Sequence, residues 1–343
     1  MRTILSTVGT SLLKARDKTL PDLVELLFFL NSTDPRKACA ETNALSRLLK
    51  DGDRLIFLHS ETEEGKLCAQ ALSLHYERQG YETAFAVIPH LSYRETHFRL
   101  QGLRSLVGKL VECIRNERAR GQEVLINATG GFKAEGAYAT LVGLLFDVPV
   151  YYIHEVFQEI IKMPAIPIDW DYSLLAEHEE FFHFLRQDLR SRYELEKKLS
   201  TVPQKIRSLL EEEENFVMLS PAGEAFFQAY LARVDQVASL PVEFSPEAWR
   251  SFEQADGTVQ ERLRNILRKL RLKEVRQRCA KVIGDLPCFI YPQGHQSERV
   301  LFCEHGNGIR VCAIVSHSDK SYEALLRRGM SCGSARRFVP FPG

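Results

Sequence analysis

Residues 125–133, with the sequence LINATGGFK, constrain the fold of this chain most strongly. They read as a buried strand that stops at Gly130 and Gly131, followed at once by a helix over residues 133–146. A strand, a glycine turn and a helix N-terminus bring backbone N–H groups and the positive end of the helix dipole to one point. The glycines let a phosphate approach the backbone, and Lys133 adds a full positive charge. The segment therefore predicts an anion site, although a turn needed for packing alone is the alternative.

The surrounding region, residues 1–168, alternates apolar segments with longer amphipathic ones. The apolar segments predict strands at residues 3–8, 54–58, 83–88, 124–127 and 148–153, and a hairpin within 157–168. The segments between them predict helices at residues 20–30, 38–50, 65–79, 93–120 and 133–146. Strands joined by helices of this length form a parallel sheet with helices on both faces, and ligands bind at the carboxyl ends of its strands.

Three loops follow predicted strands and lie where such a ligand binds. The loop after residue 8 begins with a glycine and two hydroxyl residues, the loop 59–65 follows the second strand, and the glycine turn follows the fourth. The predicted ligand residues are Gly9, Thr10, Ser11, Asn127, Thr129, Gly130, Gly131, Phe132 and Lys133. Neither G-x-G-x-x-G nor G-x-x-x-x-G-K-[ST] occurs, which disfavours a dinucleotide cofactor and ATP hydrolysis by a P-loop.

Charge is distributed unevenly along the chain, although the formal net charge is zero. Residues 1–168 are neutral, residues 169–240 carry a net charge of −6, and residues 247–343 carry +7. A basic end suggests a polyanionic partner, with nucleic acid as the leading candidate and a solvated basic face as the alternative.

The eight cysteines form no C-x-x-C pair, which disfavours a metal site and suggests a reducing cytoplasm. No apolar run is long enough to span a bilayer.

Two more domains are predicted after residue 168. Residues 169–243 read as mostly helical, with apolar residues at helical spacing over 174–199, an acidic helix end or turn at 211–214, a strand at 216–219 and a helix that begins at Ser220-Pro221. Such a pattern is typical of a winged-helix module. Residues 244–343 predict helices at 246–254, 259–282 and 320–328, strands at 288–291, 299–305 and 310–316, and a hairpin turn at 306–308. This last domain is of the α+β class.

The last domain also carries side chains suited to RNA cleavage without a metal. Cleavage through the 2′-hydroxyl needs a base, an acid and cations that stabilise the charge on the phosphate. The candidate catalytic residues are Arg299, Arg310, His317, Lys320 and Tyr322. The candidate RNA-binding residues are Arg268, Lys269, Arg271, Lys273, Arg327 and Arg328. Taken singly, each of these residues also has a structural interpretation, as a core, turn or solvated residue.

Residues 3–13 (TILSTVGTSLL), the loop 59–65 and residues 127–133 (NATGGFK) resemble the CARF domains of CRISPR-associated ancillary proteins. The resemblance covers about residues 1–168. It implies a Rossmann-like fold, a homodimer and a cyclic oligoadenylate, most commonly cyclic tetra-adenylate, bound across the dimer as an allosteric activator.

The last domain resembles RelE-type ribonuclease toxins, through its basic helices, the strand with Arg299 and the ending 315–323 (VSHSDKSYE). Many such toxins carry Lys or Arg where His317 stands. The resemblance implies a cytoplasmic CARF–RelE mRNA interferase that needs no cofactor and cuts mRNA on the ribosome, with a winged-helix connector. Two alternatives remain: a CARF–winged-helix transcription regulator that binds duplex DNA, and slow cleavage of the ring by Ser11 and Lys133.

Overall fold

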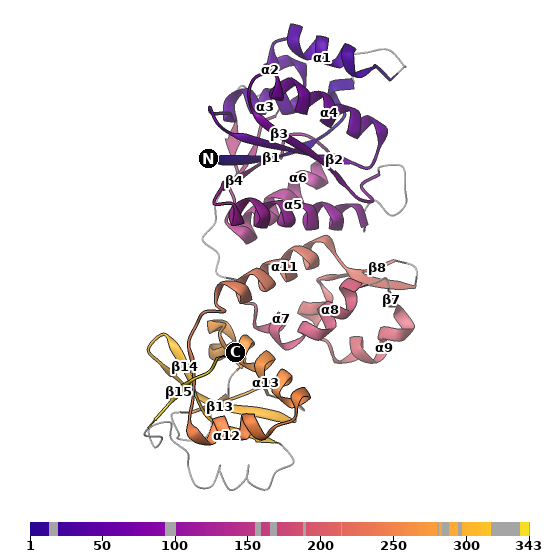
Figure 1. The fold of residues 1–343 in the computed structure, drawn as a ribbon. Helices are drawn as coiled ribbons and strands as arrows, with labels where there is room; N and C mark the ends of the chain where they lie inside the picture. Colours follow the sequence, from indigo (N-terminus) through magenta and orange to yellow (C-terminus); the bar gives the residue numbers. More distant parts are fainter. Residues whose placement is uncertain are drawn as a thin grey trace. The chain divides into compact units, whose positions relative to one another are not determined.

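The computed structural model in Figure 1 describes most of the chain. It describes residues 1–13, 20–92, 101–154, 159–164, 170–187, 190–213, 215–279, 281–282, 288–293, 297–316 and 337–342. Contacts divide the chain into two compact units, one formed by Met1–Ile168 with Phe181–Ala229 and the other by Asp169–Glu180 with Tyr230–Gly343. The range 169–243 is shared between the two units, and the predicted domain boundaries remain a prediction.

Unit 1 is built on a six-stranded sheet of order β3-β2-β1-β4-β5-β6. The first five strands are parallel and the last is antiparallel to β5. The strands are β1 (Arg2–Val8), β2 (Arg54–Ser60), β3 (Glu82–Ile88), β4 (Glu123–Asn127), β5 (Val150–Tyr152) and β6 (Ile161–Lys162). This is the strand order of a Rossmann-like fold, and it confirms the α/β prediction for residues 1–168. Parts of the predicted hairpin 157–168 lie outside the described residues.

Helices cover both faces of this sheet, as Figure 1 shows. One face carries η1 (Ser11–Leu13), α1 (Leu23–Ser32), α2 (Pro35–Ala38), α3 (Ala40–Leu48) and α4 (Glu63–Glu77), and the other carries α5 (Gln101–Ala119) and α6 (Lys133–Phe146). The predicted helix 38–50 is present as α3, which begins after the extended Cys39, and Ala38 instead ends the preceding α2. Residues 93–100 of the predicted helix 93–120 lie outside the described residues. Apolar side chains of β1, β2, α1, α3 and α4 form one continuous core.

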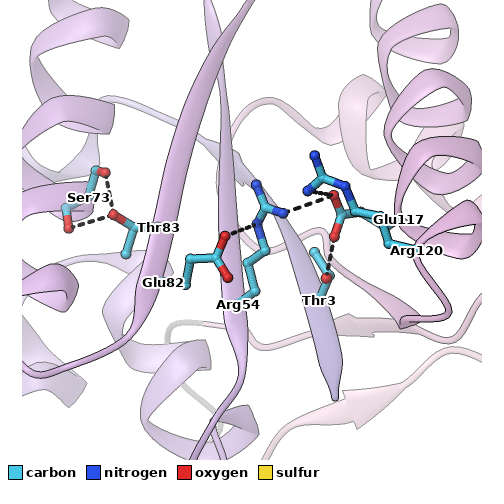
Figure 2. A network of polar contacts seen from close by, with 7 residues as sticks. All are labelled: Thr3, Arg54, Ser73, Glu82, Thr83, Glu117 and Arg120. Atoms are coloured by element: carbon cyan, nitrogen blue, oxygen red, sulfur yellow. Dashed lines mark hydrogen bonds and ion pairs between the residues drawn. The ribbon is translucent and has the colours of Figure 1, made fainter.

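The amino ends of the strands are tied by the polar network shown in Figure 2. Glu117 of α5 accepts hydrogen bonds from Thr3 Oγ1 at 2.8 Å and from Arg54 Nη1 at 3.3 Å. Arg120 Nη1 donates to the same carboxylate at 3.1 Å, and Arg54 also pairs with Glu82 at 3.3 Å. This edge of the sheet is therefore held by buried and half-buried ionic contacts.

The second part of unit 1 is a small sheet with helices. Its strand order is β7-β9-β8. Its elements include α8 (Glu179–Gln187), which starts in unit 2, β7 (Arg190–Ser191), α9 (Arg192–Thr201), α10 (Gln204–Arg207), β8 (Leu210–Glu213), β9 (Phe216–Leu219) and α11 (Pro221–Gln236), which belongs to unit 2 from Tyr230 on. The helical character predicted for residues 174–199 is present, but in separate helices, because Ser191 is extended and its hydroxyl caps α9 through Glu194 N at 3.3 Å. The acidic run from Glu211 is a strand rather than a turn, because pairing with β9 satisfies its backbone.

Unit 2 combines two long helices with a six-stranded sheet of order β11-β12-β13-β14-β10-β15. Its elements are α7 (Ser173–Glu177), β10 (Val242–Phe244), α12 (Pro246–Gln254), α13 (Gly257–Leu270), a π-helical turn (Val275–Cys279), β11 (Lys281–Val282), β12 (Phe289–Tyr291), β13 (Glu298–His305), β14 (Gly308–Ser316) and β15 (Val339–Pro340). Of the predicted helix 259–282, residues 259–270 lie in α13 and residues 275–279 in the π-helical turn, and the prediction is wrong at residues 281–282, which form β11. The predicted hairpin turn is present, with Gly306 at a φ of 56°.

The described residues allow a check of what the sequence predicts about the cysteines and about membrane-spanning helices. Cysteines 39, 68, 113, 288 and 303 are free, whereas Cys312 is disulfide-bonded, so the expectation of unpaired cysteines is wrong at that position. Sequence spacing did not indicate this bond because disulfide partners are set by distance in space. No helix in the described part of the chain has the length and apolar character needed to cross a membrane.

Candidate functional site

The candidate site lies where the strand order of the first sheet reverses. β1 and β4 are neighbours, with Ser6 opposite Asn127, and the chain leaves them towards opposite edges of the sheet. The loops that follow such a pair of strands separate and leave a crevice at the carboxyl edge, which is the usual ligand position in open α/β sheets. The structure therefore brings the predicted loops after residues 8 and 127 to one place, although 118 residues separate Gly9 from Asn127 in the sequence.

Glycines let these two loops touch through their backbones. A Cβ atom on Gly9 would lie 2.7 Å from the Gly131 nitrogen, closer than real Cβ contacts come. A Cβ atom on Gly130 would overlap both the Thr7 carbonyl oxygen and the Glu41 carboxylate. Gly131 has a φ of 91°, a conformation that side chains rarely permit. Each of the three glycines is therefore required by the geometry of the site.

Asn127 and Thr129 shape the turn from within. The Asn127 side chain is fully buried, and its Nδ2 donates to Ser6 Oγ at 2.9 Å. Thr129 Oγ1 donates to Asn127 Oδ1 at 2.7 Å and accepts from Ile153 N at 3.2 Å. The two predicted ligand residues thus connect β1, the turn and the end of β5. Their described hydrogen bonds are internal, so their contribution to a ligand would be indirect.

The N-terminus of α6 supplies the groups that face outwards. Phe132 is the N-cap residue and is 54 % exposed, and its ring has no oxygen that could accept from the first backbone N–H groups of α6. Glu135 Oε1 accepts the Phe132 N–H at 3.1 Å. Lys133 follows as an exposed first helical residue. An exposed cation and an aromatic ring beside a helix N-terminus suit a ligand that carries both phosphates and bases.

The loop after β1 is anchored by a residue that sequence analysis missed. Glu41 Oε1 accepts the Gly9 N–H at 2.7 Å, and Glu41 Oε2 accepts from Ser11 Oγ at 3.4 Å. Ser11 Oγ also accepts from Ala40 N at 3.3 Å, so the predicted ligand hydroxyl is engaged with α3. Thr10 is half-buried at the surface of this loop. The Glu41 side chain is 0 % exposed, and burial raises the pKa of its carboxyl group.

The third predicted loop, after β2, borders a separate hollow of about 530 Å³. Thr62 caps α4 by accepting the Gly65 N–H at 3.0 Å, so the loop is a tight strand-to-helix turn. The hollow is lined by His59, Glu61, Thr62, Glu63, Lys66, Phe85 and Val87. Burial lowers the pKa of His59, which favours its neutral form. The Phe85 ring is 41 % exposed and lies 6.0 Å from the His59 ring, so this hollow offers an aromatic surface.

The predicted catalytic residues are only partly described. Arg299 lies on β13 opposite Val315 of β14, on the same face of the sheet as Leu301. Arg310 lies on β14, where its Nε pairs with Glu243 at 2.7 Å and its guanidinium lies 4.7 Å from the centre of the Phe338 ring. Arg310 is therefore engaged in the sheet. His317, Lys320 and Tyr322 lie outside the described residues.

The predicted RNA-binding residues have different environments. Arg268 pairs with Glu179 at 2.5 Å, and Lys269 is buried and pairs with the same carboxylate at 3.1 Å. Burial would raise the pKa of Glu179, but Lys269 and Arg268 outweigh it and lower the pKa. Arg271 donates to the Leu240 carbonyl oxygen at 3.1 Å, whereas Lys273 is exposed. Of these four, Lys273 is the exposed one. The remaining two, Arg327 and Arg328, lie outside the described residues.

Comparison with known proteins matches part of unit 1, including the turn after β4 but not the loop after β1. Residues 36–166 match the model of a family described as CRISPR-associated protein (Cas_APE2256). The matched residues include β2–β5, the glycine turn and Glu41. This match supports a CRISPR-associated protein.

Three solved structures are also similar to the chain, at low identity. Protein VC1899 from Vibrio cholerae is 11 % identical, with 92 % of this chain and 77 % of that chain covered and a TM-score of 0.32. Can2 from Sulfobacillus thermosulfidooxidans in complex with cyclic tetra-adenylate is 11 % identical, with coverages of 95 % and 82 % and a TM-score of 0.28. Csm6 from Enterococcus italicus bound to cyclic hexa-2′-fluoro-hexa-dAMP is 9 % identical, with coverages of 100 % and 79 % and a TM-score of 0.31. Superpositions with these TM-scores do not establish a common global fold.

Proposed function

We propose that unit 1 contains a CARF-type sensor for a cyclic oligoadenylate, with cyclic tetra-adenylate as the activator. One observation carries the proposal: the loops after β1 and β4 meet through glycine backbones at the point where the strand order reverses. That position, together with the match to a CRISPR-associated family, supports a ligand domain over an ordinary packing turn.

The exposed groups of the site suit a ring of phosphates and adenines. Lys133 and the N-terminus of α6 attract phosphate, and the exposed Phe132 ring offers a surface on which a base stacks. The resemblance of residues 1–168 to CARF domains implies a dimer with the ring bound across it. We therefore propose a homodimer in which two copies of the site hold one ring.

For the C-terminal region we propose a metal-independent, RelE-type endoribonuclease that cleaves mRNA on the ribosome and so arrests translation in antiviral defence. In this reaction the 2′-hydroxyl attacks the adjacent phosphorus, and the 5′-oxygen of the next nucleotide leaves with a proton. The products are a 2′,3′-cyclic phosphate and a 5′-hydroxyl. Arg299 would stabilise the charge on the pentacoordinate phosphate, and His317, Lys320 or Tyr322 would share acid and base duty. Arg310 is paired with Glu243, so its role in this proposal would be to hold β14 in place beside the strand that carries Arg299.

The test is a translation reaction with purified ribosomes and a defined mRNA, with and without cyclic tetra-adenylate. We expect mRNA cleavage only with the ring, and 5′-hydroxyl ends on the downstream fragments. Arg299→Ala is expected to abolish cleavage and to leave ring binding unchanged, whereas Arg250→Ala, an exposed cation on α12, serves as the control for lost charge. Ring-independent cleavage, or cleavage by Arg299→Ala at the wild-type rate, would contradict the assignment.

A transcription regulator is the second candidate, because the three-stranded sheet β7-β9-β8 with α9–α11 has the element types of a winged helix. The net charge of −6 over residues 169–240 opposes duplex binding by this part. A gel-shift experiment with duplex DNA at low salt distinguishes the two candidates. Salt-dependent binding with no RNA cleavage would favour the regulator.

Slow cleavage of the ring by unit 1 is compatible with the ribonuclease proposal. Ser11 and Lys133 would carry it, although the Ser11 hydroxyl is engaged with Glu41 and Ala40. Incubation of the full-length Arg299→Ala protein with cyclic tetra-adenylate separates this activity from the ribonuclease. Linear adenylate products are expected from it, and an intact ring after long incubation would reject it.

A further inference from the structure

Glu41 is a buried acid that contacts the ligand loop after β1 twice. Its Oε1 accepts the Gly9 N–H at 2.7 Å and its Oε2 accepts from Ser11 Oγ at 3.4 Å. The side chain is 0 % exposed, so these bonds are made away from water. A buried backbone N–H that lacks an acceptor costs free energy, so the bond from Gly9 to Glu41 favours this loop position. Glu41 therefore determines where the first ligand loop lies.

The same carboxylate also lies against the turn after β4. A Cβ atom on Gly130 would overlap Glu41 Oε1 and Cδ, so the absence of a side chain at Gly130 is what makes room for the acid. Thr7 Oγ1 donates to the Gly130 carbonyl oxygen at 2.7 Å and holds the turn from the side of β1. Glu41 thus contacts both loops, although it belongs to α3 and lies 89 residues from Gly130 in the sequence.

We propose that Glu41 is a positioning residue that holds the loops after β1 and β4 together as one ligand cradle. This inference rests on the proposed sensor function and deepens it. Gly9 then binds Glu41 through its N–H and acts in the site as a structural residue. The ligand contacts are left to the outward groups, chiefly Phe132 and Lys133. Loss of the contact at Glu41 would loosen the first loop against the turn that carries these two residues, although Thr7 still holds the turn to β1.

A purely space-filling role is the alternative, and two substitutions of similar volume separate the two roles. Glu41→Gln keeps an oxygen that accepts the Gly9 N–H and an amide that donates to Ser11 Oγ. Glu41→Met fills about the same space but accepts no hydrogen bond from Gly9, which leaves a buried donor unsatisfied. If hydrogen bonding positions the loops, the two variants differ. If only volume matters, they behave alike.

The first measurement needs no ligand. Amide hydrogen exchange is followed in the full-length protein for residues 8–13 and 129–134, with β2 as the internal reference. We expect faster exchange in both loops of Glu41→Met, an unchanged β2, and wild-type exchange in Glu41→Gln. Unchanged loops in Glu41→Met, or equal acceleration in β2 and in the loops, would overturn the positioning role.

The second measurement is the affinity for cyclic tetra-adenylate. We expect Glu41→Met to bind about tenfold more weakly, the effect of one unsatisfied buried donor, and Glu41→Gln to stay within about threefold of the wild type. Glu112→Gln, which removes an exposed acid from α5, is the matched control and should bind normally. Equal affinity of the Met and Gln variants would contradict the positioning role of Glu41. If the wild type binds no ring at all, the sensor proposal fails, and the exchange experiment still decides the role of Glu41.

Discussion

Two glutamates are buried at opposite edges of the same sheet, and their partners differ. Glu117, 3 % exposed at the amino edge, meets Arg54 and Arg120 as well as the Thr3 hydroxyl (Figure 2). Glu41, 0 % exposed at the carboxyl edge, accepts hydrogen bonds from backbone N–H groups, the Ser11 hydroxyl and the Cys39 side chain, and none of these donors is a cation. The amino edge uses its cations internally, whereas the carboxyl edge leaves Lys133 exposed. Cations that are already paired hold a structure together, and an exposed cation is available to a ligand.

The largest expected effect is on stability, at the amino edge. Glu117→Ala removes the shared carboxylate and leaves the half-buried Arg54 with Glu82 as its remaining acidic partner in the network of Figure 2. We expect a loss of about 3 kcal/mol in the free energy of unfolding, as for other buried pairs that lose one member. Urea unfolding measures it. Ring affinity of the folded variant should be unchanged, and weaker binding would show that the two edges are not independent.

The next effect is expected at the carboxyl edge. Gly130→Ala places a Cβ atom where Glu41 and the Thr7 carbonyl lie, so the loops must separate. We expect about 2 kcal/mol of destabilisation from this overpacking and a loss of ring affinity of tenfold or more. Calorimetric titration measures the affinity. Gly108→Ala on α5, where no atom lies within 4 Å of the new Cβ, is the matched control and should bind normally.

A smaller effect is expected from the exposed cation of the site. Lys133→Gln keeps the helix N-terminus and removes one charge, so ring affinity should fall about fivefold at physiological salt. The unfolding free energy should be unchanged, in contrast to Glu117→Ala. Titrations at several salt concentrations provide the check, because the salt dependence of binding should become weaker. Lys109→Gln on α5 is the control. An equal loss of ring affinity in this variant would show that the net charge of the protein, and not the position of Lys133, causes the effect.

The smallest effect concerns pH. Burial raises the pKa of Glu41 above its ordinary value of 4.5, so the folded protein binds this proton more readily than the unfolded chain. Its contribution to stability is therefore fully present below pH 4.5 and is lost as the pH rises through the raised value. We expect the unfolding free energy of the wild type, measured relative to that of Glu41→Gln, to decrease as the pH rises from 4.5 through the raised pKa of Glu41. A difference that does not vary with pH would contradict the raised pKa.

Sequence reasoning succeeded where the signal is local. The five parallel strands and α6 were predicted because apolar runs indicate buried strands and helices, and glycines indicate the turns that end them. The acidic run from Glu211 was misread because charge alone does not distinguish a turn from an edge strand, whose pairing depends on β9. The helix predicted over residues 281–282 is likewise wrong, because these residues form β11 and its pairing with β12 is not visible in the local sequence.

The sequence by itself determined the position of the glycine turn, its neighbouring loop and the cation Lys133, because their pattern is contained in short segments. Only the tertiary structure decided how they combine. Parallel strand pairing placed the loops after β1 and β4 together, and helix packing placed Glu41 between them. Tertiary contacts also turned Lys269 from a candidate RNA ligand into a buried partner of Glu179. Residues far apart in the chain become partners through packing, and packing leaves no local pattern in the sequence.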